Sequence, residues 1–262
     1  MVMRRWLAHP STRDIGIDDP RLIAIRRRLV REKVFLRKIY EEWYAAIVAA
    51  LPSGDEPILE LGSGGGFLDE WLPRLITSEI QPSQDVRLVL DGQALPLAAD
   101  SLRAIVMIDV FHHLPESPRF LREAARCVRR GGRVVMIEPW VSGWSSLVYS
   151  RLHHEPFRPD ADSWEFPPGG PLSASNMALP WMMFVRDRAR FEREFPQWRV
   201  VSLRPIMPFR YLLSGGVSMR ALMPAATFGL WRAVERALTP WRRSLAMFAQ
   251  IVIERTDAEA SR

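Results

Sequence analysis

The sequence predicts an α/β fold: a doubly wound, seven-stranded, mostly parallel sheet with a helical N-terminal cover and insertions. Three observations predict it. An apolar stripe at helical spacing comes first, short apolar runs then alternate with helices through residues 57–140, and a glycine-rich turn follows the first of these runs. Continuously apolar strands that alternate with helices are typical of a parallel sheet covered on both faces.

The composition is that of an ordinary globular protein. Hydrophobic residues make up 48% of the 262 positions and charged residues 25%, which excludes a mostly disordered, collagen-like or coiled-coil chain. No run reaches the roughly 18–20 apolar residues of a membrane span, and we expect no signal peptide in the first ten residues. The single cysteine, Cys127, excludes an internal disulfide and a cysteine-based zinc site. We therefore expect a cytoplasmic protein.

The net charge of +6 is unevenly distributed along the chain. Residues 1–50 carry a balance of +5, residues 51–140 of −4 and residues 141–262 of +5. Basic flanks could attract phosphate, anionic lipid or nucleic acid. The aromatic interleaving of a nucleic-acid surface is missing, however. We interpret the densest basic cluster, Arg26, Arg27 and Arg28 with Arg31, as a solvated helix face.

Residues 20–51 are predicted to form the N-terminal cover, as one helix or as two pieces. The acidic pair before Pro20 is a helix start signal, because an acidic cap and a proline in the first turn are both favoured there. Apolar residues recur at helical spacing as far as Leu51, and a Pro-Ser-Gly turn follows. The first segment of the domain is therefore 1–51.

The second segment, 52–140, is predicted to be the core of the sheet. Strands are expected at 57–61, 75–80, 86–90, 104–108 and 133–137, and helices at 67–75 and 117–128. Only five residues separate the second strand from the third, whereas parallel neighbours normally need a crossover of about a dozen. Either this link runs extended across short strands, or the third strand is irregular.

The third segment, 141–262, is predicted to hold insertions and the closing strands of the same domain. Residues 141–182 are rich in proline and tryptophan and are expected to be ordered but irregular. A helix is expected at 183–195, a helical insertion at 214–243, and strands at 199–203 and 244–253. The helical insertion mixes large apolar residues with arginines. This pattern fits an interfacial helix pair on a membrane surface, a substrate lid, a dimer surface or ordinary core.

The segment that carries chemistry is the glycine-rich turn at 58–66. Glu60 stands at the end of the first strand, and glycines follow at alternate positions. Gly62 and Gly64 allow the backbone to approach a ligand without Cβ clashes. The expected helix beyond them would offer its free N–H groups to a carboxylate or phosphate. A dinucleotide fingerprint would require glycine at Phe67, which disfavours a nicotinamide-dependent oxidoreductase.

This spacing resembles motif I of the class I S-adenosylmethionine (SAM) dependent methyltransferases, in the small-molecule, methyltransferase type 11-like branch. The resemblance continues in register through D-G-Q-A-L-P-L at 91–97, D-V-F-H-H-L at 109–114 and R-C-V-R-R-G-G at 126–132. It covers about residues 56–140. It implies a Rossmann-like SAM-binding core in 52–140, with the acceptor-side insertions in 141–262.

The resemblance also implies a set of cofactor-binding residues. Glu60 would face the SAM ammonium, the glycine turn would cradle the carboxypropyl chain, and Glu79 would accept hydrogen bonds from the ribose. Asp109 and Phe111 would line the sulfonium side, where an aromatic face suits a cation. The complete set is Glu60, Gly62, Ser63, Gly64, Gly66, Glu79, Asp91, Gly92, Gln93, Asp109 and Phe111, with the 91–93 segment bordering the adenine.

Histidines supply the candidates for catalysis. His153 and His154 lie in the insertion after the fifth strand, where a neutral imidazole could remove a hydroxyl proton from the acceptor. The alternative is that they are hydrogen-bonded loop residues. We expect no metal there, because adjacent residues rarely point at one ion. His112 and His113 follow the fourth strand, and one of them is expected to help turn the chain.

The predicted function is methyl transfer from SAM to a small-molecule or lipid-linked acceptor, at oxygen or carbon. Residues 214–243 allow a peripheral membrane contact, and Tyr40 and Tyr44 are interpreted as packing residues of the cover. The alternatives are a non-catalytic SAM-binding or scaffold protein and, less favoured, an RNA methyltransferase. The sequence lacks the Asn/Asp-Pro-Pro-Tyr type of motif often used to methylate base amines.

Overall fold

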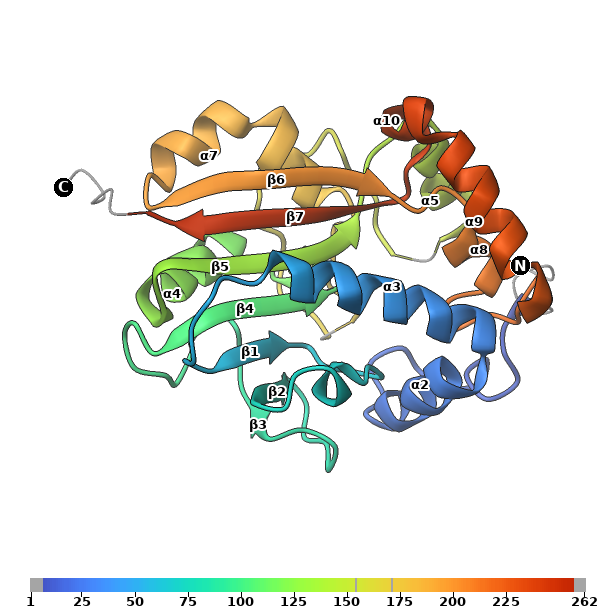
Figure 1. Ribbon diagram of the computed structural model, residues 1–262, viewed down its shortest axis with the longest axis horizontal. Coiled ribbons are helices and arrows are strands. Elements are labelled where there is room, and N and C mark those ends of the chain that lie inside the picture. Colours follow the sequence, from blue (N-terminus) through green and yellow to red (C-terminus); the bar gives the residue numbers. More distant parts are fainter. Residues whose placement is uncertain (1–6, 154, 171, 257–262) are drawn as a thin grey trace.

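The computed structural model describes residues 7–153, 155–170 and 172–256, and the predicted α/β fold is confirmed. Its seven strands form one sheet in the order β3-β2-β1-β4-β5-β7-β6, with helices on both sides (Figure 1). The strands are β1 (Ile58–Leu61), β2 (Leu75–Glu79), β3 (Leu88–Val89), β4 (Leu102–Ile108), β5 (Val128–Pro139), β6 (Trp198–Ile206) and β7 (Phe248–Arg255).

The sheet is mostly parallel. The first five strands pair in parallel, and only β7 runs against its neighbours β5 and β6. Their carboxyl ends therefore meet at one edge, which is where ligands bind in sheets of this kind. The central strands β4 and β5 are buried on both faces, as their continuous apolar runs predict.

The N-terminal cover consists of two helices, α2 (Arg21–Glu32) and α3 (Val34–Ala50). The break falls at Lys33, whose backbone leaves the helical region. The apolar stripe of α3, including Phe35, Ile39, Trp43 and Ile47, is fully buried with side chains of the sheet. Figure 1 shows α3 lying across one face of the strands. The helical cover predicted for residues 20–51 thus forms in two pieces.

The remaining helices cover the other face and the carboxyl edge of the sheet. The segment expected to be irregular contains two helices that were not predicted, α5 and the short α6. Ser142 is the N-cap of α5 and forms a reciprocal capping box with Ser145. The other helices are α4 (Ser117–Cys127), α5 (Gly143–Leu152), α6 (Leu179–Trp181), α7 (Arg188–Glu194), α8 (Arg210–Ser214), α9 (Phe228–Ala237) and α10 (Arg242–Leu245).

The helix predicted at 67–75 does not form. In its place lies a single 3-10 turn, η1 (Leu68–Glu70). Pro73 explains the difference, because a proline in the interior of so short a helix removes a hydrogen bond and clashes with the preceding turn. The Phe67 amide instead donates to the Tyr44 hydroxyl of α3 at 2.8 Å. The glycine turn is therefore not followed by a helix N-terminus.

The short link between the second and third strands is explained by the length of β3. This strand has only two residues, and they pair with Ser78 and Glu79 at the very end of β2. The chain needs to return by only about two residues, or roughly 7 Å, so no crossover helix is required. The strands are short, as the first explanation requires, but the link bends and turns rather than running extended, and the two residues of β3 pair regularly.

The fifth strand is longer than predicted. It begins at Val128, which pairs with Leu102, and the two glycines expected to end the preceding helix lie inside it. Gly131 has a φ of +69°, which takes up the register shift between the two parts of the strand. Across residues 7–153, 155–170 and 172–256, no helix is both long and apolar enough to cross a bilayer.

Candidate active site

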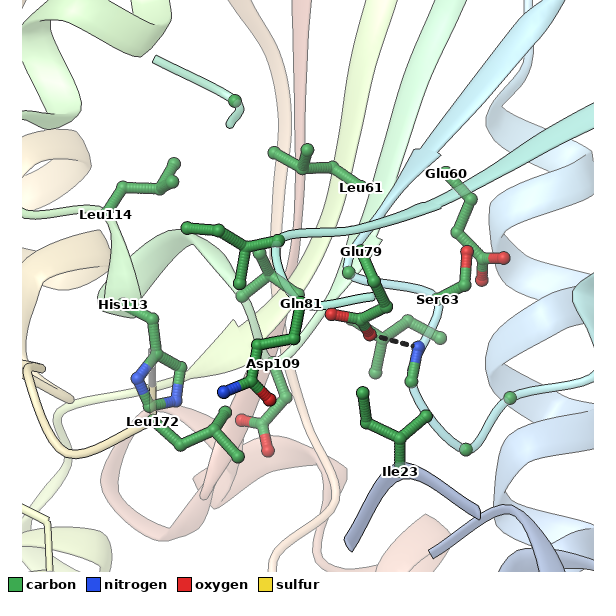
Figure 2. A pocket seen from close by; sticks show the side chains of 18 of the residues that line it. Ile23, Glu60, Leu61, Ser63, Glu79, Gln81, Asp109, His113, Leu114 and Leu172 are labelled. Atoms are coloured by element: carbon green, nitrogen blue, oxygen red, sulfur yellow. Dashed lines mark hydrogen bonds between the residues drawn. The ribbon is translucent and has the colours of Figure 1, made fainter. Parts of the chain in front are cut away.

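A cavity of about 340 Å³ opens at the carboxyl ends of β1, β2 and β4. Figure 2 shows Glu60, Ser63 and Glu79 at one end of it, with His113 and Leu114 at the other. The volume falls within the usual range for a small-ligand site. Its walls come from the cover helices, the glycine turn, the ends of the strands and the insertion near residue 170.

Almost all predicted cofactor residues line this one cavity. They are Glu60, Gly62, Ser63, Gly64, Gly66, Glu79, Asp91, Gly92, Gln93 and Asp109. The exception is Phe111, which is not part of the wall. Its fully buried ring packs against Phe120 and Phe184 in the core.

The backbone after β4 explains why Phe111 points away from the cavity. It begins the 3-10 turn η2 (Phe111–His113), and its amide and that of Val110 both donate to Glu138 Oε1, at 2.8 and 2.9 Å. This buried carboxylate fixes the turn and directs the Phe111 ring into the core. The placement of Phe111 at the sulfonium side was therefore wrong.

The glycine turn is tied to the end of β2. The Gly64 amide donates to Glu79 Oε1 at 2.5 Å, shown as the dashed line in Figure 2. The Ser63 amide donates to the Ser78 carbonyl at 2.8 Å. Gly62 has a φ of +68°, and a Cβ there would come within 2.5 Å of Val110. Only glycine fits at this position.

The buried carboxyl groups in the cavity wall have raised pKa values. Burial raises the pKa of Glu60 to about 8 and that of Asp109 to about 7, and it also raises the pKa of Glu79. Buried carboxyl groups resist ionisation unless a cation is near. A cavity lined by these groups therefore favours a positively charged ligand with hydrogen-bond donors.

Arg26 is a wall residue that sequence reasoning missed. It was interpreted as part of a solvated helix face, yet it is half-buried and lines the cavity beside the glycine turn. Among the described residues, its Nε has no hydrogen-bond partner. A Cβ on Gly65 would lie only 2.7 Å from the Arg26 carbonyl carbon, so α2 packs directly on the turn. Periodicity alone could not show this contact.

Tyr40 and Tyr44 of α3 also reach the cavity, although they were interpreted as packing residues. Both rings stack among aromatic neighbours, so that interpretation describes only part of their contacts. The hydroxyl of Tyr44 accepts the Phe67 amide and thereby holds the end of the glycine turn.

The two histidines after β4 differ in their environments. His112 is fully buried, and its Nδ1 lies 2.8 Å from Glu138 and its Nε2 3.3 Å from Glu155. Burial opposes its charge, but the two carboxylates raise the pKa of His112 well above its ordinary value. His113 lines the cavity, and burial together with the His112 charge lowers its pKa to about 3.

His153, the described member of the predicted catalytic pair, lies away from the cavity wall. His153 is not among the lining residues; its ring packs near Tyr149, and its Nδ1 accepts the Glu155 amide at 3.3 Å. His154 lies outside the described residues. The general-base role of both stays a prediction.

Comparison with known proteins gives the family. Residues 59–136 match the family model described as a methyltransferase domain. Residues 59–136 therefore carry a methyltransferase domain. The matched segment runs from β1 into β5 and includes the glycine turn, Glu79, the 91–93 segment and Asp109. None of the curated proteins compared matches the chain.

Solved structures resemble this methyltransferase over most of its length. A chain of a Haloferax volcanii complex containing the methyltransferase activator Trm112 is 15% identical with a TM-score of 0.51, covering 89% of this chain and 98% of that chain. Geranyl diphosphate C-methyltransferase from Streptomyces coelicolor A3(2) is 13% identical with a TM-score of 0.50, covering 84% of this chain and 82% of that chain. A geranyl diphosphate methyltransferase in complex with SAM is 13% identical with a TM-score of 0.51, covering 88% of this chain and 90% of that chain. At these identities the likeness establishes the fold.

Proposed function

We propose that this methyltransferase binds SAM in the cavity beside the glycine turn and transfers its methyl group to a small or lipid-linked acceptor, at oxygen or carbon. The observation that carries the proposal is the convergence of Glu60, Glu79 and Asp109 on one cavity. SAM brings an ammonium, a ribose diol and a sulfonium, which suit these three carboxylates.

The cofactor is placed by matching charges. Its ammonium would pair with Glu60, and its ribose hydroxyls would donate to the Glu79 oxygen that Gly64 does not use. The adenine would lie by Asp91 and Gln93, which are joined by a hydrogen bond of 2.8 Å from the Gln93 amide to Asp91 Oδ1. The sulfonium would lie toward Asp109.

Arg26 is our candidate for the SAM carboxylate. The helix whose N–H groups were expected to receive this anion is absent, since η1 is a single 3-10 turn. A cationic side chain therefore has to take that part. The Arg26 guanidinium lines the same end of the cavity and has a buried Nε without a partner among the described residues.

The reaction is an in-line displacement at the methyl carbon. The acceptor lone pair forms the new bond, the methyl–sulfur bond breaks, and its electron pair stays on sulfur to give S-adenosylhomocysteine. Holding the two reactants in line supplies much of the rate. A base is required only for a neutral hydroxyl or an acidic carbon, and His153 and His154 remain predictions for that role.

The cavity wall also contains apolar side chains. Ile108, Leu114, Leu172 and Val217 are among them, which favours a hydrophobic acceptor. Two structures of similar fold are named as geranyl diphosphate methyltransferases. Together these points support an apolar acceptor with an anionic part, such as an isoprenoid or a lipid-linked saccharide.

A surface near the cavity fits contact with a membrane. Figure 1 shows α9 and α10 beyond the carboxyl end of β5. Leu230 and Trp241 are 64% and 59% exposed, and Arg236, Arg242 and Arg243 of the same segment are exposed too. Exposed apolar side chains together with arginines are typical of interfacial helices on anionic lipid. A lipid-linked acceptor could be taken from that surface.

Transfer of tritium from methyl-labelled SAM tests the proposal. Prenyl diphosphates, polyprenyl phosphates and phenols would serve as acceptors, with and without anionic vesicles, for wild type and Glu60→Gln. We expect labelled product with an apolar anionic acceptor and a loss of at least tenfold in the variant. SAM binding without turnover on any acceptor would contradict the enzymatic proposal and favour a binding or scaffold protein. Labelling of added RNA instead would favour the RNA methyltransferase.

A further inference from the structure

Two histidines and a glutamate converge beside the cavity, at the end that His113 lines and that we call the acceptor end, although 42 or more positions separate the glutamate from the histidines. The Nε2 atom of His112 lies 3.3 Å from Glu155 Oε2, and the Nε2 atom of His113 lies 3.9 Å from the same oxygen. One ligand atom from each of the three residues falls within 4.8 Å of the others.

The remaining nitrogen of each imidazole is already oriented by a second partner. His112 Nδ1 lies 2.8 Å from Glu138 Oε2, and His113 Nδ1 lies 3.2 Å from the Ala174 carbonyl oxygen. Both partners are hydrogen-bond acceptors, so each Nδ1 carries a hydrogen and donates it. This leaves Nε2 of both rings directed at Glu155. Metal-binding histidines show the same arrangement, with the far nitrogen bonded to a carboxylate or carbonyl.

The spacing also fits a shared ion. Nitrogen and carboxylate ligands bind zinc at about 2.0–2.2 Å, so neighbouring ligand atoms around one ion lie roughly 3–3.5 Å apart. The His112–Glu155 separation is within this range, and the His113–Glu155 separation exceeds it by a few tenths of an ångström. All three ligand atoms lie within 4.8 Å of one another, so the His113 side chain has to move inward for the three to surround one ion.

We propose that His112, His113 and Glu155 form a binding site for one divalent transition-metal ion, such as Zn²⁺, at the acceptor end of the cavity. Imidazole ligands favour zinc, iron, cobalt or nickel over Mg²⁺ and Ca²⁺, which prefer oxygen. Three protein ligands leave coordination positions open, as in sites that bind a substrate rather than only support the fold.

The position of the site gives the ion a use. His113 lines the cavity opposite the end that holds Glu60 (Figure 2). An ion there could bind an acceptor oxygen and lower the pKa of an acceptor hydroxyl. The hydroxyl proton would then leave to water, and the oxygen lone pair would attack the methyl carbon. The site itself is inferred from the side-chain geometry and does not depend on the acceptor.

Metal titration of the chelator-treated full-length protein tests the site. Zn²⁺ and Co²⁺ are titrated by calorimetry, and the visible spectrum of bound Co²⁺ reports its coordination. The variants are His113→Asn and Glu155→Gln, which avoid the fully buried His112. Glu165→Gln, an exposed glutamate of the same insertion, is the matched control. Circular dichroism and thermal unfolding, measured on the same samples, show that each variant is folded.

We expect one ion per chain, an affinity reduced at least tenfold in both variants, and an unchanged affinity in the control. Mg²⁺ should bind at least a hundredfold more weakly than Zn²⁺. The absence of Zn²⁺ and Co²⁺ binding by a protein that binds SAM would overturn the proposal and leave His112 as a proton-sharing link between two carboxylates. Equal metal binding by folded wild type and variants would overturn it too. Either result leaves the SAM-binding proposal intact.

Discussion

The Asp18 carboxylate accepts a hydrogen bond from the backbone amide of Leu172 at 2.8 Å, although 154 positions separate the two residues. The next amide, that of Ser173, donates to the same oxygen at 3.1 Å. Leu172 lines the cavity. The start of the cover and the insertion near residue 170 are thus joined across the cofactor site, and this contact holds one wall in place.

Removing this contact should speed cofactor exchange. In Asp18→Ala, two amides lose their acceptor, so we expect SAM to dissociate about three- to tenfold faster, with unfolding free energy lower by about 1 kcal/mol. Stopped-flow fluorescence and chemical unfolding give the two quantities. Asp14→Ala, an exposed aspartate of the same segment, is the control. An unchanged dissociation rate in Asp18→Ala would show that the wall does not limit release.

The buried Glu60 predicts a pH dependence of cofactor binding. Its pKa is raised to about 8 in the folded protein, above its ordinary value, so the folded state holds more protons in the window between these two values. The contribution of Glu60 to the free energy of unfolding therefore falls as the pH rises through that window. A cationic ligand reverses this cost by favouring the ionised form.

SAM binding should consequently strengthen from pH 6 to pH 9 and release protons near pH 7. Calorimetry in buffers of different ionisation enthalpy measures the proton release. In Glu60→Gln we expect affinity at least tenfold weaker, with the Glu60 part of the proton release lost. The same pH profile and proton release in wild type and variant would rule out Glu60 as the titrating group.

Arg26 predicts a specific requirement for the cofactor carboxylate. Arg26→Met keeps much of the side-chain volume but removes the charge, so SAM affinity should fall about tenfold, or roughly 1.4 kcal/mol. An analogue of SAM without its carboxylate should lose much less affinity. Arg28→Met, on the exposed side of the same helix, is the control. If both ligands weaken equally in Arg26→Met, Arg26 does not contact the carboxylate.

The close contact between Gly65 and the backbone of α2 predicts that a larger residue at position 65 displaces the helix. A Cβ there would lie 2.6 Å from the Arg27 backbone nitrogen, so Gly65→Ala has to displace the helix. We expect a lower melting temperature and weaker SAM binding. The matched change Gly229→Ala meets nothing within 4 Å on exposed α9, and should raise unfolding free energy by about 0.5–1 kcal/mol. A stabilising Gly65→Ala would show that α2 moves freely.

The parallel sheet and most of the residues that line the cavity could be predicted from the sequence because their signals are local. The run before Glu60 is apolar, and its glycines follow at fixed spacing, so strand, turn and carboxylate are specified within a few residues. Glu79 and Asp109 could be placed because strand ends meet at one edge of a parallel sheet. The family resemblance supplied the roles of these residues.

The features that were missed depend on contacts between distant segments. Arg26 looks like part of a solvated face until α2 is seen to pack on Gly65. The Phe111 ring turns inward because Glu138, 27 positions later, captures its amide. The hydrogen bond between His112 and Glu155 connects residues 43 positions apart. No periodicity or spacing in the chain encodes these approaches, since they follow from how the insertions fold onto the sheet.

Calorimetric titration of the full-length protein with SAM, and separately with NAD, tests the central claim most directly. We predict micromolar-range binding of SAM to wild type, at least tenfold weaker binding to Glu60→Ala, and no binding of NAD. A folded wild-type protein that binds no SAM, or that binds it equally well without the Glu60 carboxylate, would contradict the placement of the cofactor in this cavity.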